Sequence, residues 1–542
     1  PGPFGYTNYE TQESYCQMLT VDPADSETVY LGGVFLWRST DGFQTSGNIA
    51  FIGGWEYPDH HADLHRLVFL PGSDSAALTG SDGGVHLTQD AGAGTVVWTP
   101  LNDGYNTSQF YKVAIDENLS GSEITLGGTQ DSGTWLGNLD SPTSDWFDLL
   151  GGDGGFCAVG SAADPAGTYY MSYQQAFGIY RAEVENATGI PWSWTRIDPL
   201  GAENSQWLWP FILDPNDTDL MYLAGDAVLW RNSALSGITG GAINPTPVNW
   251  SAIYTLPGGS PITALAMSRS AGRILYFGTA DGEFYRLEAA HAVSAGTVPT
   301  RLDTGAGFPP GAYVSGIAVN PDDDQEILIA FSNYNVANLY HSNTGGAIWT
   351  DVEGNLAGPG SPSVRAVAIL PSRDGSPVYL AGTSIGLYST ATLAGAATVW
   401  AQEAPTLIGN VVVDHLAVRP ADNLVVVGSH GRGVFRGYPK PSAVPGEGVP
   451  RMMRLEQNVP NPFNPSTAIS FTLAEGGPAI LEVFDIAGRR VRTLWSGHRE
   501  AGYHTLNWDG RDDSDRELAS GTYICRLRTE EGELSRSMAL VR

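Results

Sequence analysis

The sequence has little cysteine, few cationic side chains and no long apolar run, and each shortage excludes a class of protein. Three cysteines in 542 residues are too few for a disulfide-stapled scaffold, and their spacing does not suit a structural zinc site. No apolar stretch approaches the roughly 20 residues that a transmembrane helix needs, so we expect no membrane span.

Lysine and arginine together number 28 against 58 aspartate and glutamate residues, which gives a formal net charge of −30. Such a chain repels phosphate backbones, and we expect no nucleic-acid partner. Carboxylate and amide oxygens in loops suit Ca²⁺, the one ion that the composition suggests, although the sequence identifies no cofactor.

Glycine, proline and tryptophan are plentiful, at 67, 34 and 15 residues, and this mixture is typical of short strands joined by tight turns. Residues 1–438 contain a degenerate repeat. Each unit has an apolar strand that ends in a proline turn, a glycine-centred hairpin and a fourth segment that often carries tryptophan. The units begin near Tyr15, Asp63, Phe110, Phe156, Trp207, Ile262, Val314, Val364 and Val411.

A period of about 40–50 residues with four strands per unit is typical of a β-propeller. The sequence therefore predicts an all-β fold, with a multi-bladed β-propeller of seven to nine four-stranded blades over residues 1–438. The last unit lacks a tryptophan segment, and residues near the N-terminus could supply its fourth strand. A linker rich in proline and glycine follows at 439–450, and alternating strands predict a small immunoglobulin-like β-sandwich over 451–542.

Residues 39–45, with the sequence Ser-Thr-Asp-Gly-Phe-Gln-Thr, come close to the Asp-box, and two later segments resemble it more loosely. Residues 1–437 thus resemble the Asp-box (BNR-repeat) propellers, which include sialidases, xyloglucan-degrading glycosidases and sortilin-type receptors. In those families the box is a folding device on the blade periphery. Residues 61–65, 128–135 and 151–155, among others, are similar to exported bacterial propellers, and this second resemblance implies no particular activity.

Residues 457–465, 481–489 and 506–512 resemble the flagellar hook-assembly immunoglobulin-like module and the related C-terminal sorting domain of type IX secretion. The resemblance implies that residues 451–542 serve export or surface attachment through the secretion machinery. It also implies an extracellular protein, either secreted or held at the cell surface.

The densest polar cluster includes His61, Asp63 and His65, which would share one face of a strand because side chains alternate. Two imidazoles and a carboxylate on one face could bind a divalent metal, although a single face rarely completes a metal site without distant ligands. The alternative is that these residues form hydrogen bonds in the central channel or support a loop.

Three aspartates, Asp82, Asp131 and Asp153, lie in glycine-rich turns of successive units and are candidate catalytic residues. Turns of adjacent blades could converge on one propeller face. Such convergence could give the paired carboxyl groups of a glycoside hydrolase, about 5–5.5 Å apart for retention and 6.5–9.5 Å for inversion. The alternative, which the sequence favours, is that each aspartate caps its own turn or that the set holds Ca²⁺.

Gln109, Tyr111, Gln130 and Trp135 are candidate ligand-binding residues, because aromatic rings and amides suit sugars, although exposed aromatics could equally bind protein. The sequence thus favours a non-catalytic propeller, secreted or at the cell surface, that binds a glycan or an extracellular protein. The alternatives are a glycoside hydrolase and a structural subunit of an extracellular layer or filament.

Overall fold

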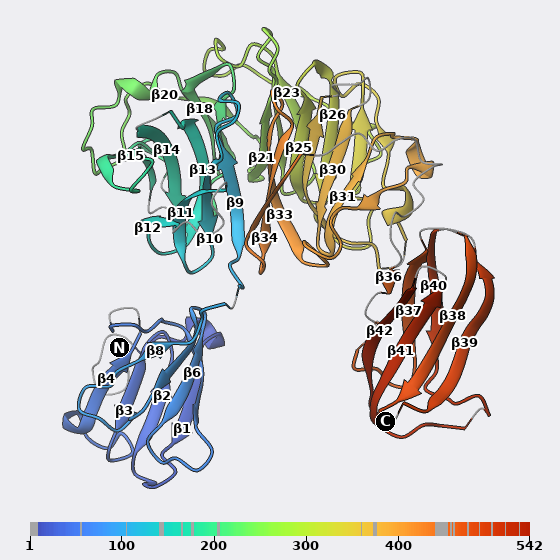
Figure 1. Cartoon of the computed structure of the whole chain (residues 1–542). Helices are drawn as coiled ribbons and strands as arrows, with labels where there is room; N and C mark the ends of the chain where they lie inside the picture. Colours follow the sequence, from blue (N-terminus) through green and yellow to red (C-terminus); the bar gives the residue numbers. More distant parts are fainter. Residues whose placement is uncertain are drawn as a thin grey trace. The chain divides into compact units, whose positions relative to one another are not determined.

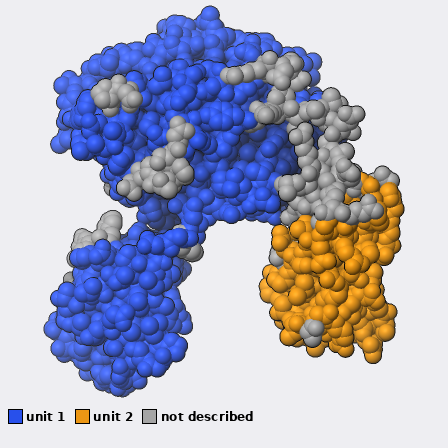
Figure 2. Space-filling model, viewed as in Figure 1, with its two compact units in different colours: residues 1–441 blue, residues 442–542 orange. Residues whose placement is uncertain are grey.

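The computed structural model describes residues 9–438 and 454–542, apart from short gaps at 55–56, 105, 140–145, 164–165, 175–177, 203–205, 359, 372–376, 456–457, 459–460, 474–475, 487, 500–501, 515 and 530–531. The chain divides into two compact units, residues 1–441 and 442–542, which Figure 2 shows in different colours. The predicted linker at 439–450 lies outside the described residues. No helix in these described ranges is both long enough and apolar enough to cross a bilayer.

The first unit is built from antiparallel sheets, and the strands of each sheet follow one another in the sequence. Seven of the described sheets form a ring, which Figure 1 shows from light blue (β9) through green and yellow to orange. Their strands are β9 (Phe110–Ile115), β10 (Ile124–Thr129), β11 (Gly133–Asn138) and β12 (Phe147–Leu150); β13 (Gly154–Ser161), β14 (Ala166–Tyr173), β15 (Ile179–Glu185) and β16 (Pro191–Arg196); β17 (Phe211–Asp214), β18 (Asp217–Gly225), β19 (Val228–Asn232) and β20 (Trp250–Thr255); β21 (Ile262–Met267), β22 (Leu275–Thr279), β23 (Phe284–Leu287) and β24 (Thr300–Arg301); β25 (Val314–Asn320), β26 (Asp323–Phe331), β27 (Leu339–Ser342) and β28 (Thr350–Asp351); β29 (Val364–Leu370), β30 (Val378–Thr383), β31 (Gly386–Thr390) and β32 (Ala401–Gln402); and β33 (Val412–Arg419), β34 (Leu424–His430) and β35 (Val434–Gly437).

The first strand of each ring sheet packs against the first strand of the next sheet, from β9 to β33. The ring closes where β33 and β34 of the last sheet pack against β9 of the first. The buried cluster at this closure consists of Phe110, Val113, Ile115, Ala417, Leu424 and Val426. These contacts make the seven sheets a closed β-propeller, as the repeat predicts.

Polar contacts cross the same closure. The Nδ1 atom of His415 accepts the backbone N–H of Val113 at 3.3 Å. Arg419 is fully buried and donates to the backbone oxygens of Asp116 at 3.3 Å and Ser122 at 2.7 Å. Buried backbone oxygens need hydrogen-bond donors. The Arg419 guanidinium supplies donors to the two backbone oxygens that apolar packing buries at the closure.

Tryptophans join neighbouring sheets, as the position of the tryptophan segment in the repeat predicts. The indole N–H groups donate to backbone oxygens at the outer edge of the preceding sheet, in the pairs Trp98–Ile52 (2.7 Å), Trp250–Ile197 (2.6 Å) and Trp400–Val352 (2.9 Å). Each indole thus fills space between two neighbouring sheets, and its N–H group still has a hydrogen-bond acceptor.

The first two sheets form what we call the N-terminal sheet pair. Its strands are β1 (Met18–Val21), β2 (Val29–Gly32), β3 (Leu36–Ser39) and β4 (Ile49–Gly53), then β5 (Leu64–Phe69), β6 (Ala77–Ser81), β7 (Gly84–Thr88) and β8 (Thr99–Pro100). β1 and β2 pack against β5, whereas the ring closes between β33 and β9. The expectation that N-terminal residues complete the last blade is therefore wrong. These residues build sheets of their own, and the last ring sheet has three strands in the described part of the chain.

The second unit is an immunoglobulin-like sandwich of two antiparallel sheets. One sheet contains β36 (Arg454–Leu455), β37 (Thr467–Leu473) and β40 (Gly502–Trp508), and the other contains β38 (Gly477–Asp485), β39 (Arg490–Arg499), β41 (Gly521–Thr529) and β42 (Gly532–Leu540). Alternate side chains of both sheets face inward around Phe463, Leu481, Trp508 and Leu527. This alternation is the signal that predicts the sandwich from sequence.

The ring closure supplies a test of the fold. We expect Arg419→Met to lower the free energy of unfolding by about 3 kcal/mol, because the buried carbonyl groups and Asp422 lose their partner. Arg301→Met removes two ion pairs, with Glu283 and Asp303, from an arginine that is 47% exposed, and it should cost less than about 1 kcal/mol. Thermal and urea unfolding of both variants measure the difference. Equal losses in the two variants would contradict a special role for Arg419.

Candidate functional site

Three aspartate side chains meet where the N-terminal sheet pair contacts the ring. Asp63 and Asp82 come from the sheet pair and Asp131 from the first ring sheet, and one carboxylate oxygen of each lies within 4.8 Å of the others. We call these three residues the carboxylate cluster. It combines one residue of the predicted metal set with two of the predicted catalytic aspartates.

Each member of the cluster lies in a turn. Asp63 directly precedes β5, Asp82 lies between β6 and β7, and Asp131 lies between β10 and β11. Asp63 and Asp131 have φ angles of 58° and 57°. Aspartate enters this left-handed region more readily than most residues, because its short side chain can hydrogen-bond locally. Asp82 and Asp131 present their carboxylates at the tips of the β6–β7 and β10–β11 hairpins, where neighbouring glycines allow tight turns. Asp63 presents its carboxylate from the loop before β5.

A short N-terminal segment, which sequence reasoning missed as part of a site, surrounds the cluster. The amide of Gln12 donates to Asp63 at 3.0 Å, and the thiol of Cys16 contacts the same oxygen at 3.6 Å. The hydroxyl of Tyr15 donates to Asp82 at 3.2 Å. Nothing in the local sequence pattern links these residues to the aspartates, because the contacts arise only when the strands pack.

His61 connects the sheet pair to the ring. Its Nε2 atom lies 3.0 Å from the backbone oxygen of Asp131, and its Nδ1 atom lies 3.1 Å from that of Ala62. Carbonyl oxygens only accept hydrogen bonds, so both ring nitrogens face acceptors. In this arrangement His61 acts as a donor that fixes the Asp131 turn.

The three residues of the predicted metal set do not share one strand. β5 begins at Leu64, so His65 is the only member of the set within it, and the Nε2 atom of His65 lies 2.6 Å from the carboxylate of Asp82. Asp63 instead faces Asp82 and Asp131. A metal held by His61, Asp63 and His65 stays a prediction, and the described oxygens favour the carboxylate cluster as the place for a cation.

Asp153 lies directly beside the cluster. Its carboxylate accepts the backbone N–H of Asp131 at 2.8 Å, so the turn after β12 supports the turn after β10. The structure thus brings Asp82, Asp131 and Asp153 to one end of the ring. Asp153 bonds the backbone of Asp131 and is not one of the three residues of the carboxylate cluster.

The cluster is electrostatically strained. Burial, followed by the charges of Asp153, Asp82 and Asp63, raises the pKa of Asp131 to about 6. Burial and the charge of Asp82 also raise the pKa of Asp63. Two unit charges at this separation repel by about 3–4 kcal/mol at an effective dielectric constant near 20. It is therefore unfavourable for all three carboxyl groups to be ionised at once, unless a cation binds between them. Without a cation, the cluster tends to retain a proton.

This arrangement can support two kinds of chemistry. Three carboxylate oxygens within reach of one point are hard donors of the type that Ca²⁺ prefers, and a bound cation would relieve the repulsion. Alternatively, a carboxyl group with a pKa of about 6 beside a second carboxyl group is the pairing that a general acid and its partner require.

The predicted ligand-binding residues gather only in part. The backbone oxygen of Gln109 accepts the N–H of Gln130 at 2.9 Å, and Gln109 also forms a bridge to His430. The ring of Tyr111 lies 6.0 Å from that of His430. Burial, followed by the charges of Asp153 and Asp131, raises the pKa of the Tyr111 hydroxyl, and the neighbouring Trp207 side chain opposes this shift. Trp207 is 48% exposed, and sequence reasoning named it only as the start of a repeat unit.

Trp135 lies apart from these residues. It belongs to β11 and lines a separate hollow of about 560 Å³ with Trp146 and Arg436, beside the three-stranded last sheet. Its indole donates to the backbone oxygen of Ser132 in the same turn. Trp135 therefore does not face Tyr111, and its role in ligand binding stays a prediction.

One segment of the chain matches a known domain family. Residues 462–533 match the FlgD Ig-like domain. The match lies within the second unit, whose two-sheet sandwich agrees with it. No curated protein matches the chain.

The chain is also similar to several solved structures. These include PorZ, a surface component of the type-IX secretion system of Porphyromonas gingivalis, at 12% identity over 97% of this chain and 70% of that one, with a TM-score of 0.29. The extracellular domain of the two-component system protein BT3049 from B. thetaiotaomicron is similar at 12% identity over 97% and 67%, with a TM-score of 0.43. Likenesses this distant carry no functional argument, and the propeller assignment rests on the closed ring itself.

The raised pKa of Asp131 predicts how stability depends on pH. A carboxyl group whose pKa is higher in the folded state stabilises the fold at pH values below its unfolded pKa of about 3.9. That stability is lost as the pH rises through about 6. We expect Asp131→Asn to be more stable than the wild type by about 1–2 kcal/mol at pH 7.5 in chelator, after allowance for solvent screening. The two proteins should be nearly equal at pH 3, below the unfolded pKa of the carboxyl group.

Calorimetric unfolding in EDTA at both pH values measures this difference. Asp322→Asn is the matched control, because Asp322 is an exposed turn residue outside the cluster. A wild type that is at least as stable as Asp131→Asn at pH 7.5 would show that the cluster carries no repulsion.

Proposed function

We propose that this protein is an extracellular β-propeller that binds a glycan at the ring end that carries the carboxylate cluster. The observation that supports the proposal is the meeting of carboxylates with exposed aromatic side chains. Tyr15 is 54% exposed and hydrogen-bonds with Asp82. Trp207 is 48% exposed and lies beside Tyr111, whose hydroxyl pKa is raised by burial and then by the charges of Asp153 and Asp131.

The chemistry of these groups suits a sugar. Sugar hydroxyls donate to carboxylate oxygens, and the apolar face of a sugar ring buries well against a flat aromatic ring. A cation on the cluster would add direct coordination of hydroxyl oxygens. The carboxylates of Asp82 and Asp131 project from hairpin turns that the packed sheets hold in place, so these two side chains need little ordering on binding.

We further propose that the second unit serves export or surface attachment, acting with the secretion machinery. The match of residues 462–533 to the FlgD Ig-like domain supports a small autonomous module at this end of the chain. A compact sandwich with its own core can fold and be recognised independently of the ring. A sorting function of the type IX kind is the specific form that the sequence resemblance implies.

A glycoside hydrolase is the second candidate, and the raised pKa of Asp131 favours it. The cluster brings carboxylate oxygens within 4.8 Å of one another, and a retaining hydrolase needs two carboxyl groups about 5–5.5 Å apart. In this form Asp131 would donate the proton to the leaving group, and Asp82 or Asp63 would be the nucleophile.

A glycan array probed with the purified chain, in Ca²⁺ and in EDTA, tests the binding proposal. We expect Trp207→Ala to weaken glycan binding at least about tenfold, equivalent to ~1.4 kcal/mol. Trp192→Ala is the matched control, because Trp192 is 60% exposed on β16 and should leave binding unchanged. Recognition of an extracellular protein with no glycan bound would instead support a protein ligand.

Hydrolysis is tested on polysaccharides with the wild type, Asp131→Asn and Asp82→Asn. If the chain is a hydrolase, each variant should lose about 10²-fold or more of turnover while still binding the substrate. Turnover that is absent in the wild type, or unchanged in both variants, would remove the hydrolase and leave the binding propeller.

A further inference from the structure

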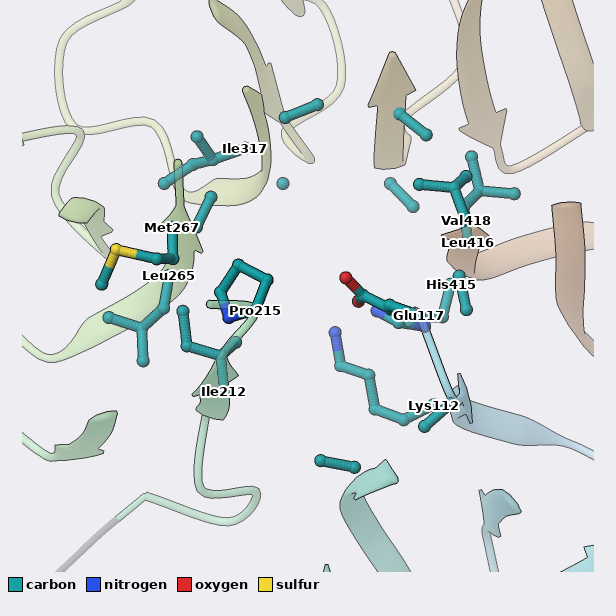
Figure 3. A pocket seen from close by; sticks show the side chains of 18 of the residues that line it. Lys112, Glu117, Ile212, Pro215, Leu265, Met267, Ile317, His415, Leu416 and Val418 are labelled. Carbon is teal, nitrogen blue, oxygen red and sulfur yellow. The ribbon is translucent and has the colours of Figure 1, made fainter. Parts of the chain in front are cut away.

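The inner strands of the ring enclose a channel with a volume of about 280 Å³. Its wall is mainly aliphatic, and Figure 3 shows Ile212, Leu265 and Met267 on one side, with Lys112 and His415 on the other. A cavity with a largely aliphatic lining and a few polar groups is the usual form of a small-molecule site.

Most charges that line the channel are already paired. At one end Arg269 pairs with Glu117 and also donates to Asn118 at 3.2 Å. Near Lys112, Arg365 lies 3.8 Å from the carboxylate of Asp414. His430 lies 3.0 Å from the other oxygen of Asp414, so both oxygens of this carboxylate have a partner.

Lys112 is the exception. In the described part of the chain its ammonium group has no carboxylate within ion-pair distance, and it lies 4.1 Å from the centre of the Phe156 ring. A cation–π contact compensates only part of the cost of holding a charge away from water. The ring thus holds a cation whose natural partner is an anion inside the channel.

His415 adds a second donor next to Lys112. Its Nδ1 atom accepts the backbone N–H of Val113, so the neutral ring carries its proton on Nε2. Both residues line the channel, on the neighbouring strands β9 and β33. Two donors and an aliphatic wall match the two oxygens and the hydrocarbon chain of an organic acid.

We propose that the central channel binds an aliphatic monocarboxylate, with the carboxylate held by Lys112 and His415 and the hydrocarbon chain along the wall formed by Ile212, Leu265 and Met267. This site lies inside the ring, and it does not depend on the proposed glycan function. The ligand class follows from the chemistry of the lining, in which apolar contacts supply affinity and the ammonium group selects the anion.

The titration of Lys112 gives the site a pH dependence. Burial lowers the pKa of Lys112 to about 8, opposed by the charges of Asp414 and Cys157. Burial, and then the charge of Lys112, lowers the pKa of His415, which stays neutral. A carboxylate ligand is ionised above a pH of about 5, so affinity should be highest between that value and about 8 and should fall at higher pH.

Calorimetric titration of the full chain with octanoate tests the proposal, with octanol as the uncharged comparison. We expect octanoate to bind at pH 7 and to bind at least tenfold more weakly to Lys112→Met, whereas octanol should bind both proteins equally. Arg301→Met is the control for an exposed cation outside the channel and should bind octanoate as the wild type does. The Lys112→Met variant should remain folded, because Met is an unbranched side chain only one atom shorter than Lys and removes an unpaired charge.

The pH profile of the wild type provides a second measurement that needs no variant. Octanoate affinity should fall at least threefold between pH 7 and pH 9.5, while octanol affinity stays constant. The proposal is overturned if the wild type does not bind octanoate, if Lys112→Met binds it equally well, or if the two ligands share one pH profile.

Discussion

The contact of β33 and β34 with β9 is the interaction on which the rest of the ring depends. A propeller sheet buries both of its faces against neighbours, so an open row of sheets would leave an apolar face at each end. The closure joins residues about 300 positions apart, with Val113 and Leu424 in one buried cluster. Arg419 completes it by satisfying the backbone oxygens that the packing removes from water.

Local signals explain how much of this fold could be predicted. The predicted starts at Phe110, Ile262, Val314 and Val364 coincide with the first residues of β9, β21, β25 and β29. These starts were predictable because a proline turn and a glycine hairpin mark the ends of the strands in each unit, and both are visible in the local sequence. Ring membership depends on packing between distant strands, so the separation of the sheet pair from the seven-sheet ring was not predictable from the repeat.

The same distinction applies to the candidate site. Asp82 and Asp131 were predicted because glycine-rich turns are a local signal, and their turns do meet. The participation of Gln12, Tyr15 and Asp63 follows from how the sheet pair packs beside the ring, which no spacing in the sequence encodes. Like charges held this close are tolerated only because the surrounding turns fix them, and such tension is typical of places that bind a partner.

The last ring sheet, which has three strands in the residues that the structure describes, has a mechanical consequence. The chain leaves the ring from β35, an edge strand paired on one side with β34, from Val425↔Gly437 to Gly428↔Val434. If the C-terminal unit is anchored, any pull enters the ring at Gly437 and peels this hairpin from its open end, one bond at a time. Glu123 of the neighbouring sheet grips this end through Arg436 and Tyr438. These contacts of Glu123 would have to break before the strands of the last sheet begin to separate.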